Sequence, residues 1–257
     1  MFQNTYPVFE AKRLLKKEML DNLRDYPRNL FTIQYQNYSD GILFGCELEE
    51  TRGGLNIMPG ILYYKSIPYF LEKPYRVVCE AEGKQAYLKV RFWDKAAGSG
   101  GVEYLSQVVV DEQPPNPEHE MELARFKLQP GARLRTEYTD FYDYDTEYDT
   151  VNRIHVPYAA PEGSGIWPGM FQCFARAMLR NTMTNPWDHA FCFSCLQLKE
   201  AMPYEVARAY LNGRLGQEKE YTNMQIYNSL KSILREANQR QAQPRQSQKK
   251  EGTLIML

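Results

Sequence analysis

Residues 40–75 read DGILFGCELEETRGGLNIMPGILYYKSIPYFLEKPY. Short runs rich in Ile, Leu and Tyr are separated here by the turn dipeptides Gly53-Gly54 and Pro59-Gly60. Glycine supplies the positive φ that many turns need, and proline fixes φ at the first corner of a turn. Between the two dipeptides, residues 55–58 alternate like a half-buried strand. We therefore predict a tight antiparallel meander that belongs to an all-β domain.

The same alternation of apolar and polar residues recurs on both sides of this stretch. It is found in residues 31–38, 75–80, 86–94, 102–110 and 120–128. In residues 86–94, for example, Leu88, Val90 and Phe92 would all face one side of a strand. Segments rich in Gly or Pro separate these runs. About seven short strands joined by regular turns predict a β-sandwich.

The N-terminal part of the chain favours a helix. Apolar residues within 8–24 keep helical spacing with charges opposite them, and Pro27 follows as a stop signal. We predict a helix over residues 8–24. Its apolar stripe either packs on the sheet of the same chain or docks on a neighbouring subunit, and the sequence leaves both uses open.

The second half of the chain has a different pattern. Apolar residues at helical spacing predict helices over residues 167–180, 186–199, 204–211 and 221–238. Gly213 is placed to end the third of these helices, and Thr222 is placed to cap the fourth. Helices so close together in the sequence predict an antiparallel bundle.

The predicted fold class is therefore α+β, with an N-terminal helix and an antiparallel β-sandwich followed by an α-helical bundle. We place the two domains at residues 1–160 and 161–238. Residues 239–257 are predicted to form a disordered tail, because they are rich in Gln and Lys. The apolar tip at 254–257 is either a docking peptide or an ordinary frayed end.

Composition excludes several classes of protein. The chain has 257 residues, of which 43% are hydrophobic and 25% are charged, so it can bury a sizeable core. Its formal net charge of −1 gives no electrostatic drive toward nucleic acid or an anionic membrane. We recognise no secretory signal or membrane span, and expect a cytoplasmic protein or a part of an exported assembly, without membrane insertion. The 5 cysteines do not indicate a disulfide framework.

Soft metal ligands occur in the first two predicted helices of the second half. They are Cys173, His189, Cys192 and Cys195. Four nitrogen and sulfur ligands could form a structural zinc site, if the two helices bring them together. The competing interpretation is that these cysteines are small core residues, because free cysteine is commonly buried.

Hard metal ligands occur in the acidic, aromatic segment 139–150, TDFYDYDTEYDT. Its aspartates are Asp140, Asp143, Asp145 and Asp149, and oxygen ligands at such spacing could hold calcium. The competing interpretation is a charged loop or strand edge that discourages stray pairing. We assign a metal to neither set, and we expect no cofactor.

The sequence contains none of the motifs that are typical of a nucleophile elbow, a zinc protease, a phosphate-binding loop or a dinucleotide-binding site. We therefore expect no enzymatic activity. A hydrolase is conceivable only if two carboxyl groups from the acidic segment face each other across a pocket. A module that binds a carbohydrate or a peptide is a further alternative, because the chain has 19 Tyr and tyrosine is favoured at contact surfaces.

The central stretch resembles tail-fibre and baseplate proteins of contractile phage-like machines. The resemblance rests on a strand pair with a recurring GL…PG pattern in the shoulder domain of receptor-binding proteins. The matching positions are Tyr38, Gly41, Gly45, Gly54, Leu55, Ile57, Pro59, Gly60 and Pro68, with Ser66 where the family often has Gly. The order of a sandwich followed by a helical bundle is also similar to the type VI secretion baseplate subunit TssK.

This resemblance implies a structural role in a phage-tail-like particle, with other protein subunits as partners and no catalytic residues. It also implies a homo-oligomer, with a trimer as the expected state. We expect subunits to meet through the apolar stripes of the helices at 167–180 and 221–238. Two features of the family are missing here, namely a separate head domain and an N-terminal W-x-G…H-F-Q pattern.

Overall fold

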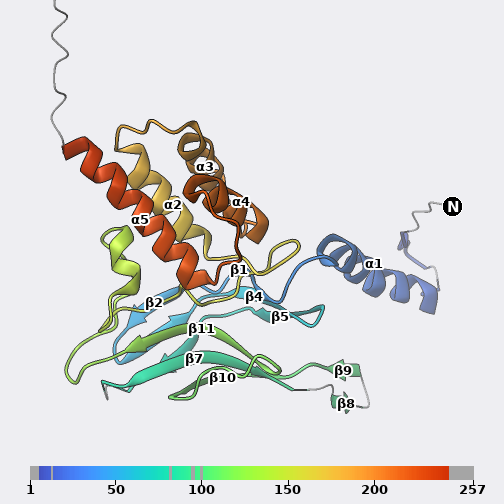
Figure 1. Ribbon diagram of the computed structural model, residues 1–257. Coiled ribbons are helices and arrows are strands. Elements are labelled where there is room, and N and C mark those ends of the chain that lie inside the picture. The colour runs from blue at the N-terminus through green and yellow to red at the C-terminus, as the bar shows by residue number, and fades with distance from the viewer. Residues whose placement is uncertain (1–5, 13, 81–82, 94–95, 99–100, 243–257) are drawn as a thin grey trace, which may run out of the picture.

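The computed structural model describes residues 6–12, 14–80, 83–93, 96–98 and 101–242. Figure 1 shows two layers of strands, a group of helices above them, and the helix α1 (Lys17–Tyr35) projecting to one side. Strands fill the chain between residues 41 and 127, and helices fill most of residues 168–242. The predicted α+β fold class, with strands first and helices after them, is therefore confirmed.

The central stretch forms one long hairpin that bends from one sheet into another. Strands β1 (Gly41–Gly45) and β2 (Leu48–Thr51) form one arm, while β3 (Gly54–Ile57) and β4 (Gly60–Tyr64) form the other. β2 pairs with β3 near the tip, and β1 pairs with β4 farther along. The predicted meander is wrong, because β3 and β4 are successive parts of one arm and do not pair.

One further strand adds to each half of the hairpin, which gives two three-stranded sheets. β4 continues into β5 (Ile67–Leu71) through the two-residue turn Lys65-Ser66, whose positive φ values of 48° and 63° are those of a hairpin turn. β6 (Tyr75–Val78) adds to the other side of β3. The resulting three-stranded sheets have the orders β1-β4-β5 and β2-β3-β6.

Close backbone contacts explain the glycines of this stretch. A Cβ atom on Gly60 would lie 2.4 Å from the backbone nitrogen of Cys46, where the hairpin bends. A Cβ atom on Gly54 would lie 1.9 Å from the carbonyl oxygen of Val77 on the neighbouring strand β6. Both positions therefore exclude any side chain, because real Cβ contacts are never this short.

Gly54→Ala is expected to lower the free energy of unfolding by about 3 kcal/mol, because the new methyl group forces β3 and β6 apart. Urea unfolding measures this loss. The control is Gly53→Asn next to it, where a Cβ meets nothing within 4 Å and asparagine tolerates the positive φ of 80°. Equal stability of the two variants would contradict this account of the β3–β6 contact.

A second layer of strands closes the first core. β7 (Gln85–Phe92) lies between β10 (Ser106–Asp111) and β11 (Glu120–Lys127), and β8 (Ala96–Gly98) pairs with β9 (Gly101–Glu103) as a small ribbon. Leu88, Val90 and Phe92 are buried, as their alternation predicts. They share one hydrophobic cluster with residues of β1, β2, β3, β4, β6 and β11. This core between two strand layers matches the predicted sandwich.

The N-terminal helix differs from its prediction. Residues 8–12 and 14–16 are not helical, and α1 runs through Pro27 to Tyr35. The stop signal at Pro27 and the strand at 31–38 were wrong, because apolar residues continue at helical spacing beyond the proline. Phe31 and Tyr35 are four residues apart, and their rings contact each other at 4.6 Å between centroids on one face of the helix.

The helices of the second half pack around a second core. α2 (Pro168–Leu179), α3 (Pro186–Leu196), α4 (Tyr204–Leu215) and α5 (Asn223–Ala242) all contribute buried residues to one cluster. Thr222 caps α5 as predicted, because its hydroxyl accepts a hydrogen bond from Gln225 N at 3.3 Å. α4 continues past Gly213 and ends at Gly216, whose φ is +62°.

The remaining predictions concern boundaries. Residues 239–242 belong to α5, so the predicted tail cannot begin at 239. Residues 243–257, including the tip 254–257, lie outside the described residues. The domain boundary near residue 160 stays a prediction. Phe141 and Ile154 lie in the helical core, Ala201 lies in the strand core, and Trp167 packs against both.

In the described part of the chain, no helix is both long and apolar enough to span a bilayer.

Candidate interaction surface

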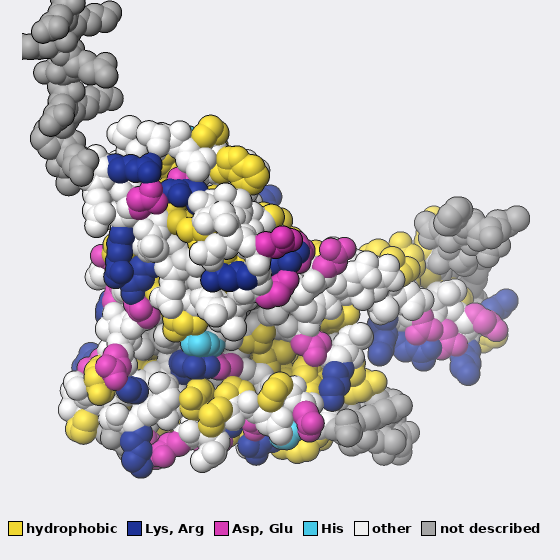
Figure 2. All heavy atoms as spheres, viewed as in Figure 1, with side chains coloured by type: hydrophobic (Ala, Val, Ile, Leu, Met, Phe, Trp, Pro, Cys, Tyr) yellow, Lys and Arg dark blue, Asp and Glu magenta, His cyan; other side chains and the backbone are white. Residues whose placement is uncertain are grey.

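The helix α1 carries an apolar stripe that the rest of the described chain leaves largely uncovered. Its members follow steps of four and three residues, which place them on one helix face: Met19, Leu23, Tyr26, Leu30 and Ile33, with Leu20 beside them. Apart from the half-buried Met19, each member exposes between 47% and 66% of its surface. Charged side chains gather along the lower side of the arm in Figure 2. We call these six residues the α1 stripe.

Among the described residues, the contacts that attach α1 to the body of the protein lie at its C-terminal end. Tyr35 is buried in a small cluster with Leu43, Tyr63 and Ala159, and its carbonyl oxygen accepts a hydrogen bond from the Tyr63 hydroxyl at 3.1 Å. Just after the helix, the Tyr38 hydroxyl donates to Glu200 at 3.0 Å. The helix is thus held at one end, with its stripe directed away from these contacts.

The described part of the chain supplies little packing to the apolar stripe of α1. A helix of 19 residues that is not packed is marginal in water, and Pro27 inside it costs about 3 kcal/mol. The exposed parts of the stripe amount to on the order of 500 Å², compared with about 800 Å² per partner in a standard interface. Covering that area would stabilise the helix by on the order of 10 kcal/mol before the cost of association.

The helices that were expected to meet other subunits do not expose their stripes. On α2, Met170, Phe171 and Phe174 are at most 1% exposed, and on α5 the residues Tyr227 and Leu230 are fully buried. These side chains form the core of the same chain. The predicted contact surface on the helices at 167–180 and 221–238 was therefore wrong, because the apolar side chains of these helices are buried against one another within the same chain.

The structure does not gather the proposed zinc ligands into a site. Cys192 and Cys195 are buried in the helical core, Cys173 is half-buried, and His189 is exposed. Burial raises the pKa of the Cys192 thiol to about 12, so that it stays protonated at neutral pH. Among the described residues, no group of three or more His, Cys, Asp or Glu side chains is placed to hold a metal ion.

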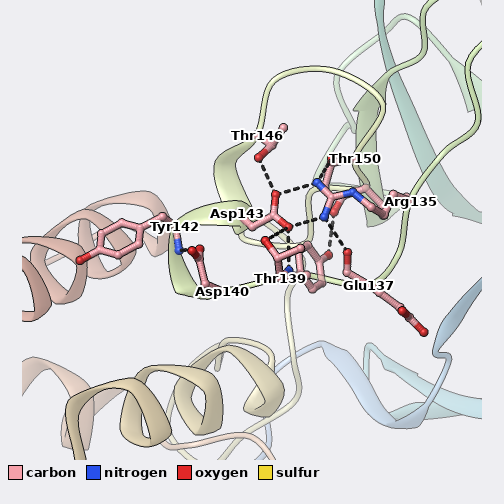
Figure 3. A network of polar contacts seen from close by, with 10 residues as sticks. Arg135, Glu137, Thr139, Asp140, Tyr142, Asp143, Thr146 and Thr150 are labelled. Atoms are coloured by element: carbon pink, nitrogen blue, oxygen red, sulfur yellow. Dashed lines mark hydrogen bonds and ion pairs between the residues drawn. The ribbon is translucent and has the colours of Figure 1, made fainter. Parts of the chain in front are cut away.

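The acidic segment forms a polar network around Asp143, which Figure 3 shows from close by. The segment folds into a short 3-10 helix, η1 (Phe141–Asp145), whose first turn is capped by Asp140 through Tyr142 N at 2.7 Å. The buried Asp143 carboxylate accepts hydrogen bonds from both terminal nitrogens of Arg135 and from Thr139 and Thr146. Arg135 in turn holds the pKa of Asp143 well below its usual range, against the effect of burial.

The other carboxylates of this segment have different partners. Asp145 accepts hydrogen bonds from Lys231 Nζ at 2.6 Å and from the Tyr227 hydroxyl at 3.0 Å, both on α5. Glu147 pairs with Lys127 on β11 at 2.6 Å. Asp149 accepts from Gln129 N at 2.9 Å. The aspartates proposed as calcium ligands are therefore spread over separate contacts, of which that of Asp145 reaches the helix α5.

The hydrolase alternative finds no support in this arrangement. Asp145 and Glu147 both line a hollow of about 350 Å³ between β11 and α5. However, Lys231 and Lys127 hold these two carboxylates in ion pairs, and the two groups do not face each other as a pair. Paired carboxyl groups for glycoside cleavage need one group to protonate and another to attack.

Sequence reasoning missed the α1 stripe because it ended the helix at Pro27. The signal was present, since Leu23, Tyr26, Leu30 and Ile33 keep steps of three and four across the proline. The sequence left two uses open for the apolar stripe of the N-terminal helix, packing on the sheet or docking on another subunit. In the structure, only the end of α1 near Phe31 and Tyr35 packs on the strands among the described residues. The stripe itself remains available to a partner.

No family model matches the sequence, and no curated protein matches it. Two solved structures are similar to the chain at 8% sequence identity and a TM-score of 0.41. The first is a crystal structure of TssK, and the match covers 92% of this chain and 72% of that one. The second is a cryo-electron microscopy structure of the type VI secretion TssK-TssF-TssG baseplate subcomplex, with 91% of this chain and 100% of that one covered. Both structures contain TssK, and at this TM-score the likeness carries no argument about this chain.

Proposed function

We propose that this chain is a non-enzymatic assembly subunit of a phage-tail-like baseplate and that it acts through contacts with other proteins. The observation that carries this proposal is the α1 stripe, an amphipathic helix face that stands clear of the body. The likeness of residues 38–68 to baseplate and receptor-binding proteins supports a phage-tail-like baseplate as the assembly. The candidate metal and acidic residues contribute to folding contacts, which favours a structural role.

The partner is another protein subunit, with a further copy of the same chain as the first candidate. An exposed stripe of Leu, Ile and Tyr on a helix fits the hydrophobic groove or helix bundle of a partner protein. The resemblance adds the expectation of a trimer. The place of such a subunit is in the cytoplasm or in the assembled particle.

Leu23→Glu combined with Leu30→Glu is expected to abolish self-association, because two carboxylates in the stripe oppose its burial. Light scattering at micromolar concentration measures the mass, which should exceed the 30.1 kDa of one chain in the natural protein. The variant should fall to the mass of a monomer with an unchanged circular dichroism spectrum. The matched control is Lys17→Glu, which makes the same change in net charge on the polar face of α1.

A second experiment tests the assembly itself. The tagged chain is expressed together with sheath, tube and wedge proteins of a phage-tail-like baseplate from the same genome, and the complexes are purified. We expect at least one wedge protein to be retained by the natural chain and lost by the Leu23→Glu, Leu30→Glu variant. A chain that is monomeric at micromolar concentration and retains none of these proteins would refute the proposed function.

A further inference from the structure

A groove runs between the base of α1, the edge strand β5 and the end of β7. It consists of two hollows of about 990 Å³ and 560 Å³ that meet at Ile67 and Tyr104. The first lies at the end of β7 and includes Trp93 and His119. The second lies between β5 and the face of α1 that carries Arg28. No residue of the α1 stripe lines either hollow, so the groove is a separate surface.

Aromatic rings form the floor and walls of the groove. On the floor, the rings of Tyr64 and Phe92 stack at 4.1 Å, and Tyr69 meets Phe92 edge-on at 4.8 Å. On the walls, Trp93 and Tyr104 are 43% and 38% exposed. Buried rings that already contact one another lose little freedom when a ligand binds, and exposed Trp and Tyr are typical anchors of protein interfaces.

Backbone hydrogen bonds hold the walls in place. Trp93 N donates to the carbonyl oxygen of Leu105 at 3.1 Å, which ties the end of β7 to the segment that carries Tyr104. Phe92 N donates to the carbonyl oxygen of His119 at 2.9 Å, which ties β7 to the loop before β11. The groove therefore exists before any ligand arrives, and a preformed site binds at a lower cost in entropy.

The charged groups of the groove are mostly hydrogen-bond donors. It is lined by the cations Arg28, Lys65 and Arg91 and by the imidazole of His119, against one carboxylate from Glu118. Arg91 is paired with Glu120 at 2.7 Å. Among the described residues, neither Arg28 nor Lys65 has a carboxylate within ion-pair distance, although the hydrogen bond from Arg24 and, less strongly, the charge of Arg28 lower the pKa of Asp25. Lys65 Nζ lies 5.1 Å from the centre of the Tyr64 ring. The side chains of Lys and Arg donate hydrogen bonds and accept none, so they favour a negatively charged ligand that is rich in hydrogen-bond acceptors.

We propose that this groove binds an extended, acidic segment of a partner protein, with aromatic or proline side chains seated between Trp93 and Tyr104. An acidic peptide fits better than a neutral sugar, because its carboxylates complement the charges of Arg28 and Lys65. Side chains rather than strand pairing carry the affinity, since Pro68 on the edge strand β5 has no N–H to offer. The inference gives the peptide-binding alternative a location, and it does not depend on the α1 stripe.

Selection from a random peptide library tests the chemistry of the ligand. Twelve-residue peptides displayed on phage are selected against the full-length chain, and the recovered peptides are synthesised with a fluorescent label. We expect Asp or Glu together with Tyr, Trp, Phe or Pro to be enriched. Binding measured by fluorescence anisotropy should weaken as salt rises, because charges contribute to it.

Two variants place the bound peptide in the groove. Trp93→Ala and Lys65→Glu are each expected to weaken binding by at least about 10-fold, because one removes an anchor ring and the other reverses an attractive charge. The control is Trp187→Ala on α3, an exposed tryptophan outside the groove, which should leave the affinity unchanged. Lys65 is exposed in a turn, so its variant remains informative if Trp93→Ala perturbs folding.

Three results would overturn the inference. They are a failure to select any peptide, selected peptides without acidic residues, and affinity that is unchanged in both groove variants. Binding of acidic polysaccharides on a glycan array, without peptide binding, would assign the groove to a carbohydrate instead. The Leu23→Glu, Leu30→Glu variant should still bind the peptides, and Trp93→Ala should keep the natural oligomeric mass. The two proposals therefore fail independently.

Discussion

Glu120→Gln should lower the free energy of unfolding by about 3 kcal/mol at pH 7, because it removes the central anion of a buried ion-pair network. Glu120 Oε1 accepts a hydrogen bond from Arg91 Nε at 2.8 Å and lies 2.7 Å from Arg91 Nη2, and Oε2 accepts from Asn116 N at 2.9 Å. Oε2 also lies 3.0 Å from Lys89 Nζ, and the Lys89 side chain is only 2% exposed. A buried ammonium group that loses a carboxylate partner retains the cost of its own desolvation.

The effect should vanish in acid. Burial by itself would raise the pKa of Glu120, but hydrogen bonds from Asn116, Lys89 and Arg91 outweigh it and lower the pKa to about 2. The unfolded chain keeps a value of about 4.5. A carboxyl group whose pKa is lower in the folded state stabilises the fold fully above its unfolded pKa. That contribution is lost as the pH falls from about 4.5 through 2.

Urea unfolding at a series of pH values measures this difference. The gap in unfolding free energy between the natural chain and Glu120→Gln should be largest above pH 5 and should close toward pH 2. The control is Glu49→Gln, which changes an exposed carboxylate on β2 and should leave stability nearly unchanged. A gap that is constant over the whole pH range would show that the variant acts through packing and not through charge.

The strands were predictable from sequence because alternation determines which side chains are buried. Leu88, Val90 and Phe92 face the core as their spacing of two requires. Lys89 between them is buried as well, in ion pairs with Asp111 and Glu120. The bend of the long hairpin was not predictable in the same way. It depends on Cys46 N donating to the carbonyl oxygen of Pro59 at 3.3 Å, a contact between positions 13 residues apart. A local pattern cannot distinguish this bend from a turn of a meander.

The interaction surfaces were harder to predict, for different reasons. Residues 31–35 alternate with a period of two and also keep helical spacing, so that tertiary contacts of Tyr35 decided between strand and helix. The groove brings together residues 28, 65, 93 and 104, which share no motif. The acidic segment was visible as a cluster of carboxylates, but its partners Arg135, Lys127 and Lys231 come from separate elements. Only the fold shows that these charges are already paired.

Phe141→Ala should be the most damaging change in the acidic segment, with a loss of about 3–5 kcal/mol in unfolding free energy. The Phe141 side chain is 0% exposed, and its ring lies 5.2 Å from that of Tyr227 on α5 and 5.4 Å from that of Phe174 on α2. Its carbonyl oxygen also accepts a hydrogen bond from the Tyr227 hydroxyl at 3.0 Å. Truncation therefore leaves a cavity at the point where the segment meets the helices.

Thermal unfolding should show the loss as a fall in midpoint on the order of 10 °C for a chain of this size. Amide hydrogen exchange should locate it, with protection falling more in α2 and α5 than in β7 and β11, because Phe141 belongs to the helical core. Phe141→Leu should cost less, since it keeps most of the buried volume. Tyr148→Ala, a more exposed position in the same segment, is the second control. If Phe141→Ala is no more harmful than Tyr148→Ala, the ring of Phe141 does not anchor the acidic segment in the helical core.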